Sequence, residues 1–214
     1  MPGRRTAEDY LRSEYVRLLP SLQRTSTAVE TEVRHLLLPL TIELDPYERV
    51  IVKSRVKDCE SAIDALRRRQ PYGLFDPDRA EEYALVNLPD LVGVRVLAFP
   101  PRRLNAVRDA LLPRLQTWVA DHMPAASLDL DNVGFKYSGR WRDSDTFRSE
   151  IQIVSLLVGL FWEVEHAAVY KPSPNLRGIV RSVEMRQRVA AVESALNAFE
   201  DEFGRILDDA SQAF

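Results

Sequence analysis

Several segments of this chain alternate between apolar and polar residues, which is the pattern of β-strands whose two faces meet different environments. The segment FRSEIQIVS, residues 147–155, shows the pattern clearly. Ile151 and Ile153 point to one side of such a strand. Glu150 and Gln152 point to the other side. Because a strand this rich in β-forming residues is usually at least half buried, its polar face either meets solvent or lines a site built on the sheet.

Two further segments predict strands of the same kind. In VIVKSRVK, residues 50–57, one face is apolar and the other carries three basic side chains, those of Lys53, Arg55 and Lys57. In the predicted strand at residues 133–141, Lys136 and Phe135 fall on opposite faces. A turn near residues 143–145 is expected to join this strand to FRSEIQIVS as a β-hairpin.

The clearest buried strand is LPDLVGVRVLAF, residues 88–99, which ends at two prolines and has Asp90 near its beginning. A helix follows it from about residue 104 to residue 119, and a short strand is expected near residues 127–130. With the other predicted strands, these elements indicate an α/β or α+β domain of four or five strands with flanking helices.

Helices are expected to extend this domain at both ends. Residues 6–20 predict one helix that Pro20 ends, and a second helix begins near Thr27 and ends at Pro39. Residues 182–212 predict a long helix whose apolar residues recur at alternating spacings of three and four, as in a heptad repeat. This apolar seam packs either on the domain itself or against a second copy of the chain, as a homo-oligomer.

Composition excludes several classes of protein. The formal net charge of −3 argues against a generally basic nucleic-acid-binding surface, although it leaves a local basic groove open. The single cysteine, Cys59, excludes an internal disulfide and a multi-cysteine zinc site. No apolar run approaches the roughly 18 residues of a membrane helix, and MPGRRTAEDY lacks the apolar core of a secretory signal. We therefore expect a cytoplasmic protein that is not embedded in a membrane.

The polar strand faces, taken together, suggest a site on the sheet. Asp90 and Glu150 come from two strands and can share a divalent cation such as Mg²⁺, which proteins commonly hold through one or two carboxylates plus substrate phosphates. The basic strand face could hold a polyphosphate, and an aromatic ring could stack on a nucleobase. The alternative is a sheet face covered with solvent-exposed salt bridges, which is the commoner use of such residues.

Four segments of the chain resemble motifs of the RelA/SpoT-type alarmone synthetases, and its length resembles that of the small, single-domain members. SRVKDCESAIDAL, residues 54–66, is similar to the family's R-x-K-S-x-x-S-I-x-x-K-L segment, and PDLVGVRVLAF, residues 89–99, to its D-L-I-G-I-R-V strand. SEIQIVS, residues 149–155, is similar to E-I-Q-I-R-T, and FWEVEHAAVYK, residues 161–171, to W-A-E-I-E-H-x-x-x-Y-K. Four motifs in this order and spacing are fairly specific.

The resemblance implies a nucleotidyltransferase-like mixed sheet flanked by helices, within the α+β class. It implies an N-terminal helical extension at residues 1–45, a RelA/SpoT-like synthetase domain at residues 46–175 and a C-terminal helix at residues 176–214. The implied reaction transfers the β,γ-pyrophosphoryl group of ATP to the ribose 3′-hydroxyl of GDP or GTP, making (p)ppGpp with Mg²⁺ as cofactor.

The resemblance also implies roles for individual residues. Arg55 and Lys57 would contact the ATP side of the site. Asp90 would bind Mg²⁺, and Glu150 would help to bind the metal or activate the 3′-hydroxyl, which makes these two the expected catalytic residues. Gln152 would line the acceptor site. The full set of expected substrate-binding residues is Lys53, Arg55, Lys57, Phe135, Lys136 and Gln152.

The segment LDLDNVGFKYSGRW, residues 128–141, departs from the family's acceptor loop, P-K-x-N-G-Y-R-S-L-H. Phe135 replaces a tyrosine, and its ring can still stack on guanine. Asp131 and Gly139 stand where the family has a lysine and a histidine, so two phosphate-binding groups are absent. Basic residues that could compensate are Lys136, Arg140 and Arg142.

Three hypotheses follow from this mixture of matches and departures. The first is an alarmone synthetase that uses ATP and GDP or GTP. The second is a divergent toxic relative that pyrophosphorylates the 3′ end of tRNA. The third is a catalytically silent nucleotide-binding protein that keeps the fold. Asp90 together with Glu150 argues against the third, since a silent protein has no need of both.

Overall fold

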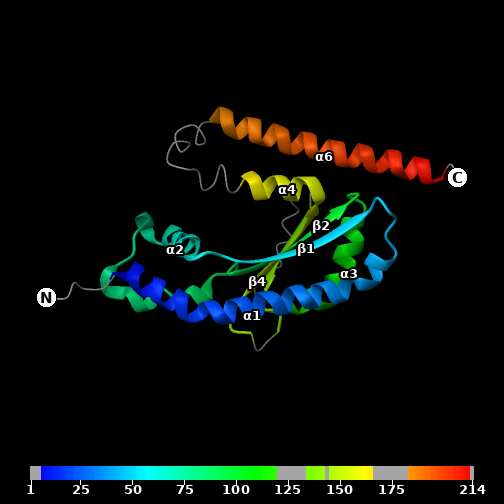
Figure 1. Ribbon diagram of the computed structural model, residues 1–214. Helices are drawn as coiled ribbons and strands as arrows, with labels where there is room; N and C mark the ends of the chain where they lie inside the picture. Colours follow the sequence, from blue (N-terminus) through cyan, green and yellow to red (C-terminus); the bar gives the residue numbers. More distant parts are fainter. Residues whose placement is uncertain (1–5, 120–133, 143–144, 166–182, 213–214) are drawn as a thin grey trace.

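The computed structural model describes residues 6–119, 134–142, 145–165 and 183–212 (Figure 1). The short strand expected near residues 127–130 lies outside the described residues, as does the expected boundary between residues 175 and 176. The division into a domain and two helical extensions therefore stays a prediction.

A four-stranded mixed sheet forms the centre of the described structure, with the order β1-β2-β4-β3. Strand β1 (Arg49–Val56) pairs antiparallel with β2 (Val92–Phe99). Strand β2 pairs parallel with β4 (Ser149–Ser155), and β4 pairs antiparallel with β3 (Gly134–Gly139), which confirms the expected hairpin. The mixed sheet with its flanking helices confirms the α+β fold class.

The expectation of two N-terminal helices is wrong, because Ala7–Ile42 forms one continuous helix, α1, with Pro20 and Pro39 inside it. A proline in a helix interior costs about 3 kcal/mol. The buried residues of α1, all apolar except Ser26, recur every three or four positions from Leu11 to Leu37. Each such side chain contributes about 1.5–3 kcal/mol on burial, so the packing of the whole helix outweighs the cost of the prolines.

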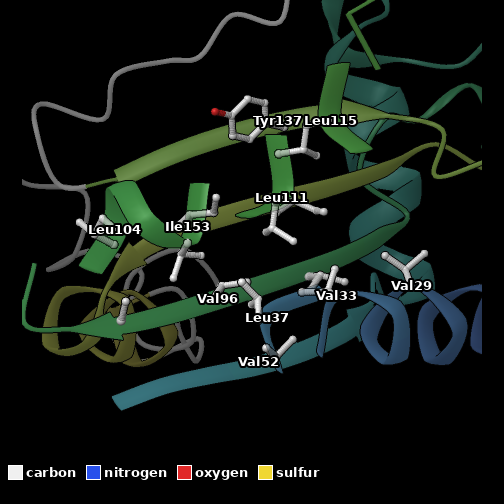
Figure 2. Packing of buried hydrophobic residues seen from close by; sticks show 14 of the residues in the cluster. Val29, Val33, Leu37, Val52, Val96, Leu104, Leu111, Leu115, Tyr137 and Ile153 are labelled. Carbon is white, nitrogen blue, oxygen red and sulfur yellow. The ribbon is translucent and has the colours of Figure 1, made fainter. Parts of the chain in front are cut away.

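Helices α1 and α3 (Arg103–Val119) cover one face of the sheet and enclose the main hydrophobic core. Figure 2 shows Val33 and Leu37 of α1 beside Val96 of β2. Helix α3 adds four buried side chains to this core, those of Leu104, Val107, Leu111 and Leu115. The strand residues that face this core therefore cannot line a solvent-accessible site.

A second hydrophobic cluster joins the N-terminal half of α1 to α2 (Cys59–Arg68) and to the short 3₁₀ turns η2 (Pro77–Glu82) and η3 (Leu85–Asn87). A third such turn, η1 (Pro71–Gly73), follows α2 and buries no residue. Asp58 is the N-cap of α2, as the sequence predicts, and its carboxylate accepts a hydrogen bond from the Ser61 backbone N–H at 2.9 Å. This cluster holds the end of β1 next to the segment that leads into β2.

Helices α4 (Leu156–Glu165) and α6 (Val183–Gln212) lie on the opposite side of the sheet from α1 (Figure 1). Gly159 lets α4 approach the sheet, because a Cβ there would lie 2.3 Å from Leu97 Cδ2. The buried Glu200 of α6 accepts a hydrogen bond from the Leu157 backbone N–H at 2.8 Å. Helix α6 is thus fixed to the first turn of α4.

The apolar seam expected on the C-terminal helix is exposed over much of its length. Val192, Phe199 and Ile206 are 47%, 54% and 52% exposed, and Phe203 packs partly on Phe99. Association of two copies of the chain through this seam stays a prediction. In the described parts of the chain, no helix combines the length and apolarity needed to cross a membrane.

One buried ion-pair cluster ties the beginning of β1 to the beginning of α3. The fully buried carboxylate of Glu48 accepts a hydrogen bond of 2.8 Å from Arg102 and another of 2.8 Å from Arg103. Burial would raise the pKa of this carboxyl, but the hydrogen bonds from Arg103, from the Asp45 backbone and from Arg102 hold the pKa below its ordinary value.

We predict that Glu48 contributes to acid sensitivity. The stabilisation of the fold by the ionised Glu48 carboxylate is complete above the ordinary carboxyl pKa of 4.5, and it is lost as the pH falls through the lower folded-state pKa. Glu48→Gln should lower the free energy of unfolding at pH 7 by about 2 kcal/mol. It should also flatten the pH dependence of this free energy below the ordinary carboxyl pKa of 4.5. Urea unfolding between pH 7 and pH 3 measures both effects, with the exposed Glu43→Gln as control. An unchanged pH dependence in Glu48→Gln would contradict the assignment.

Candidate active site

The face of the sheet opposite α1 and α3 carries polar side chains in two rows. Strand pairing aligns one row across all four strands, made of Lys53, Arg95, Gln152 and Lys136. The next row consists of Arg55, Gly93, Glu150 and Ser138. A one-residue change of register would send every one of these side chains to the helix-covered face, so the hydrophobic core fixes the two rows.

A pocket of about 530 Å³ opens on these rows and is bounded by α2 and α4. The sequence-predicted residues that line it are Arg55, Lys57, Asp90, Lys136, Glu150 and Gln152. The pocket therefore brings together both expected catalytic carboxylates and four of the six expected substrate-binding residues. Arg55 of β1 and Glu150 of β4 are far apart in the sequence, and they meet here because β2 lies between these two strands in the sheet.

Glu150 lies at the floor of the pocket and is only 7% exposed. The Lys136 Nζ atom is 2.7 Å from its Oε2 atom, and the Gln152 side-chain amide donates a hydrogen bond of 2.6 Å to its Oε1 atom. The Arg95 Nε–H in turn donates to Gln152 Oε1 at 2.9 Å. Both oxygens of Glu150 are thus held by fixed donors, so the carboxylate has one defined orientation.

Asp90 also lines the pocket, and it forms an ion pair with Lys57. The Lys57 backbone N–H donates to the Leu91 carbonyl at 2.8 Å, and the Tyr15 hydroxyl donates to the Lys57 carbonyl at 2.9 Å. These contacts tie the position of Lys57 to both β2 and α1. The Asp90–Lys57 pair is therefore built on rigid elements.

The two carboxylates are of the kind that hold Mg²⁺ together with substrate phosphates. Asp90 and Glu150 line one pocket, and each is neutralised by a lysine. Among the described residues there is no group of three or more histidine, cysteine or acidic side chains that could hold a metal unaided. Mg²⁺ commonly uses one or two carboxylates and completes its coordination with water and substrate phosphates. Mg²⁺ binding by Asp90 and Glu150 remains a prediction.

Two arginines give the pocket a cationic wall. Arg95 is largely buried, and burial followed by the nearby charge of Arg55 lowers the pKa of its guanidinium. Within the described residues, Arg55 has no carboxylate within ion-pair distance. Its guanidinium lines the pocket and is available to an anionic ligand.

Two sequence-predicted residues lie elsewhere. Lys53 lines a neighbouring pocket of about 280 Å³ and pairs with Glu163 of α4, with 3.1 Å between Nζ and Oε2. Phe135 lies on the helix-covered face, where its ring packs against the main core and stands 4.8 Å from the Arg108 guanidinium carbon. The aromatic residue that lines the pocket is Trp162 instead.

The sequence analysis missed Arg95 and Trp162, both of which line the pocket. Arg95 had a detectable signal, because it is the one charged residue in the run LVGVRVLAF and strand periodicity puts it beside Gln152. Trp162 is the tryptophan of the segment FWEVEHAAVYK, but its place in an apolar helix does not show which side of the helix faces the sheet.

Solved structures of small alarmone synthetases share this fold at low sequence identity. The small alarmone synthetase 1 from Bacillus subtilis bound to its product pppGpp aligns with a TM-score of 0.62 and 17% identity, covering 92% of this chain and 97% of that chain. The same synthetase bound to AMPCPP gives a TM-score of 0.58, 17% identity and coverages of 92% and 98%. A GTP pyrophosphokinase family protein from Streptococcus pneumoniae gives 0.60, 20% identity and coverages of 94% and 96%.

These similarities confirm the fold that the sequence resemblance implied. No protein-family model matches the sequence, and no curated protein is significantly similar to it.

We predict that Arg55 provides a main anchor for phosphate groups. Arg55→Ala should raise the Kd for inorganic tripolyphosphate by about tenfold or more, because a hydrogen bond to a charged group is worth about 1.5–3 kcal/mol. Isothermal titration calorimetry at low ionic strength measures the Kd. The control is Arg188→Ala, since this arginine pairs with Glu184 on the surface of α6. Equal affinity in the wild type and Arg55→Ala would contradict the assignment.

Proposed function

We propose that this chain transfers the β,γ-pyrophosphoryl group of ATP to the ribose 3′-hydroxyl of GDP or GTP, making (p)ppGpp. The observation that carries the proposal is the fixed Glu150 carboxylate. It shares a pocket with Asp90 and with Arg55, which has no ion-pair partner among the described residues, on the fold of the alarmone synthetases. A site for phosphoryl transfer needs cationic contacts for the phosphates and a carboxylate near the nucleophile, and this pocket offers both.

The ligands of the structural neighbours support this proposal. One neighbour was solved with AMPCPP and another with pppGpp, both of which carry several phosphates. The pocket in this chain has matching chemistry, because Arg55, Arg95 and Lys57 contribute three cations to its wall. At 15–20% identity the neighbours establish the fold alone, so the activity rests on the residues of the pocket.

On the donor side, Arg55 and Lys57 bind the phosphates of ATP. Asp90 and Glu150 would hold Mg²⁺, which would neutralise charge on the transferring phosphates. The lysines that pair with these carboxylates in the structure are then free to contact phosphate oxygens. Positioning of the two substrates in one pocket supplies a large part of the rate acceleration.

In the transfer step, the 3′-oxygen of the acceptor ribose attacks the β-phosphorus of ATP. The bond from that phosphorus to the oxygen bridging the α- and β-phosphates breaks, and AMP leaves with this oxygen. The proton of the 3′-hydroxyl passes to the Glu150 carboxylate, which the Gln152 side-chain amide holds in place. Gln152 also lines the pocket, and we assign it to the acceptor side.

The acceptor stays the open part of the proposal. Phe135 is turned away from the pocket, and Asp131 falls outside the described residues. A guanine base that stacks on Phe135 therefore has no support from this structure. The same donor chemistry would serve an acceptor bound differently, such as the 3′ end of tRNA.

We predict that the chain moves label from γ-labelled ATP to a guanosine nucleotide in the presence of Mg²⁺. Glu150→Gln and Asp90→Asn should each slow this transfer by about a hundredfold or more, because general base and charge-stabilising groups contribute on that scale. Thin-layer chromatography of the products measures the transfer. Asp109→Asn on α3 is the control, since α3 packs on the other face of the sheet. Transfer at the wild-type rate in either site variant would refute the site assignment.

The same assay separates the three hypotheses when GDP, GTP and bulk tRNA are offered in parallel. Label on GDP or GTP supports the alarmone synthetase. Label on tRNA alone supports the second hypothesis, a relative that pyrophosphorylates the 3′ end of tRNA. Absence of label on all three acceptors favours a silent nucleotide-binding protein.

A further inference from the structure

The C-terminal helix contacts the wall of the pocket through one hydrogen bond between side chains. Trp162 of α4 lines the pocket, and its indole Nε1–H donates to Glu193 Oε1 of α6 at 2.9 Å. Indole nitrogen is a donor only, and Glu193 provides a charged acceptor. Rotation of the Trp162 ring would break this bond.

Trp162 stands at one end of a continuous series of contacts that reaches the floor of the pocket. The Arg95 guanidinium lies 5.9 Å from the centre of the Trp162 ring. Arg95 donates to Gln152 at 2.9 Å and to the Gly159 carbonyl at 3.1 Å, and Gln152 donates to Glu150 at 2.6 Å. Movement of the indole would therefore remove one of the surfaces that hold Arg95 in position.

The position of Glu193 does not depend on the pocket residues themselves. Helix α6 is fixed to α4 at another point, where buried Glu200 accepts the hydrogen bond from the Leu157 backbone N–H. Glu193 also lies close to Glu165, another residue of the pocket wall. Burial, and then the charge of Glu193, raise the pKa of the Glu165 carboxyl. Glu193 is thus an acceptor brought to the pocket by a separately anchored helix.

We propose that Glu193 is a positioning residue that, from the C-terminal helix, fixes the Trp162 ring against Arg95 and so orders the nucleotide pocket. The inference rests on the proposed function for the ligand that the pocket takes, and it adds α6 to the parts of the chain that determine donor affinity. Residues that support a binding group contribute by keeping it in its productive orientation before the ligand arrives. Glu193 acts on the ligand only through Trp162 and Arg95.

The first test needs no nucleotide. The protein is labelled with 5-fluorotryptophan, and the Trp162 resonance is assigned as the one missing from Trp162→Phe. In Glu193→Ala this resonance should shift and broaden, since the indole loses its acceptor. Glu193→Gln keeps a carbonyl acceptor and should restore the wild-type position. The matched control is Glu202→Ala, which removes a glutamate of the same helix that pairs with Arg205. An unmoved resonance in Glu193→Ala would overturn the inference.

The second test is a double-mutant cycle on binding of the ATP analogue AMPCPP with Mg²⁺, measured by titration calorimetry. Glu193→Ala should raise the Kd by about three- to tenfold in the wild-type background, as expected for the loss of one partly buried hydrogen bond to a charged group. In the Trp162→Phe background, which lacks the indole N–H, the same change should have no further effect. Equal effects in the two backgrounds would overturn the inference, because Glu193 would then act without Trp162.

The two tests also separate this inference from the proposed function. A wild-type chain that fails to bind AMPCPP overturns the proposed function and, with it, the effect on affinity. Normal AMPCPP binding with an unmoved Trp162 resonance in Glu193→Ala overturns the positioning role alone. Glu193→Met keeps the length of the side chain and removes its acceptor, so it replaces Glu193→Ala if melting shows that the alanine variant unfolds.

Discussion

The parallel pairing of β2 with β4 is the constraint on which the candidate site depends. It places Gly93 opposite Glu150 and Arg95 opposite Gln152, while Val94 and Ile151 face the core. The core side chains fix this register, since a slip of one residue would bury charges and expose valines. The hydrophobic effect therefore determines where the polar groups of the pocket lie, although none of them takes part in the core.

The helices on the two sides of the sheet bury one face and leave part of the other face open. On one side, α1 and α3 exclude water from a continuous core (Figure 2). On the other side, α4 covers only part of the sheet, and Gly159 permits its close approach at Leu97. The remainder of that face stays open and becomes the pocket. Helix α6 is anchored to α4 through Glu200, and it meets the pocket wall through Trp162.

The sequence predicted those parts of the structure that depend on local periodicity. The alternation in residues 147–155 correctly separated Glu150 and Gln152 from Ile151 and Ile153, because strand geometry alone decides which residues share a face. Prediction failed where packing decides the outcome. Pro20 does not end α1, since burial on both sides of it outweighs the lost hydrogen bond. Trp162 reaches the pocket because of how α4 docks, which no local pattern contains.

The two expected catalytic carboxylates each pair with a lysine, so neither carboxylate lacks a counter-ion in this structure. Asp90 has Lys57, and Glu150 has Lys136. A magnesium–nucleotide complex would bring a cation for the carboxylates and anions for the lysines at the same moment. Loading and unloading would then be an exchange of counter-ions, in which no buried charge loses its partner at either stage. Such a site can release a highly charged product without a folding penalty for the protein that remains.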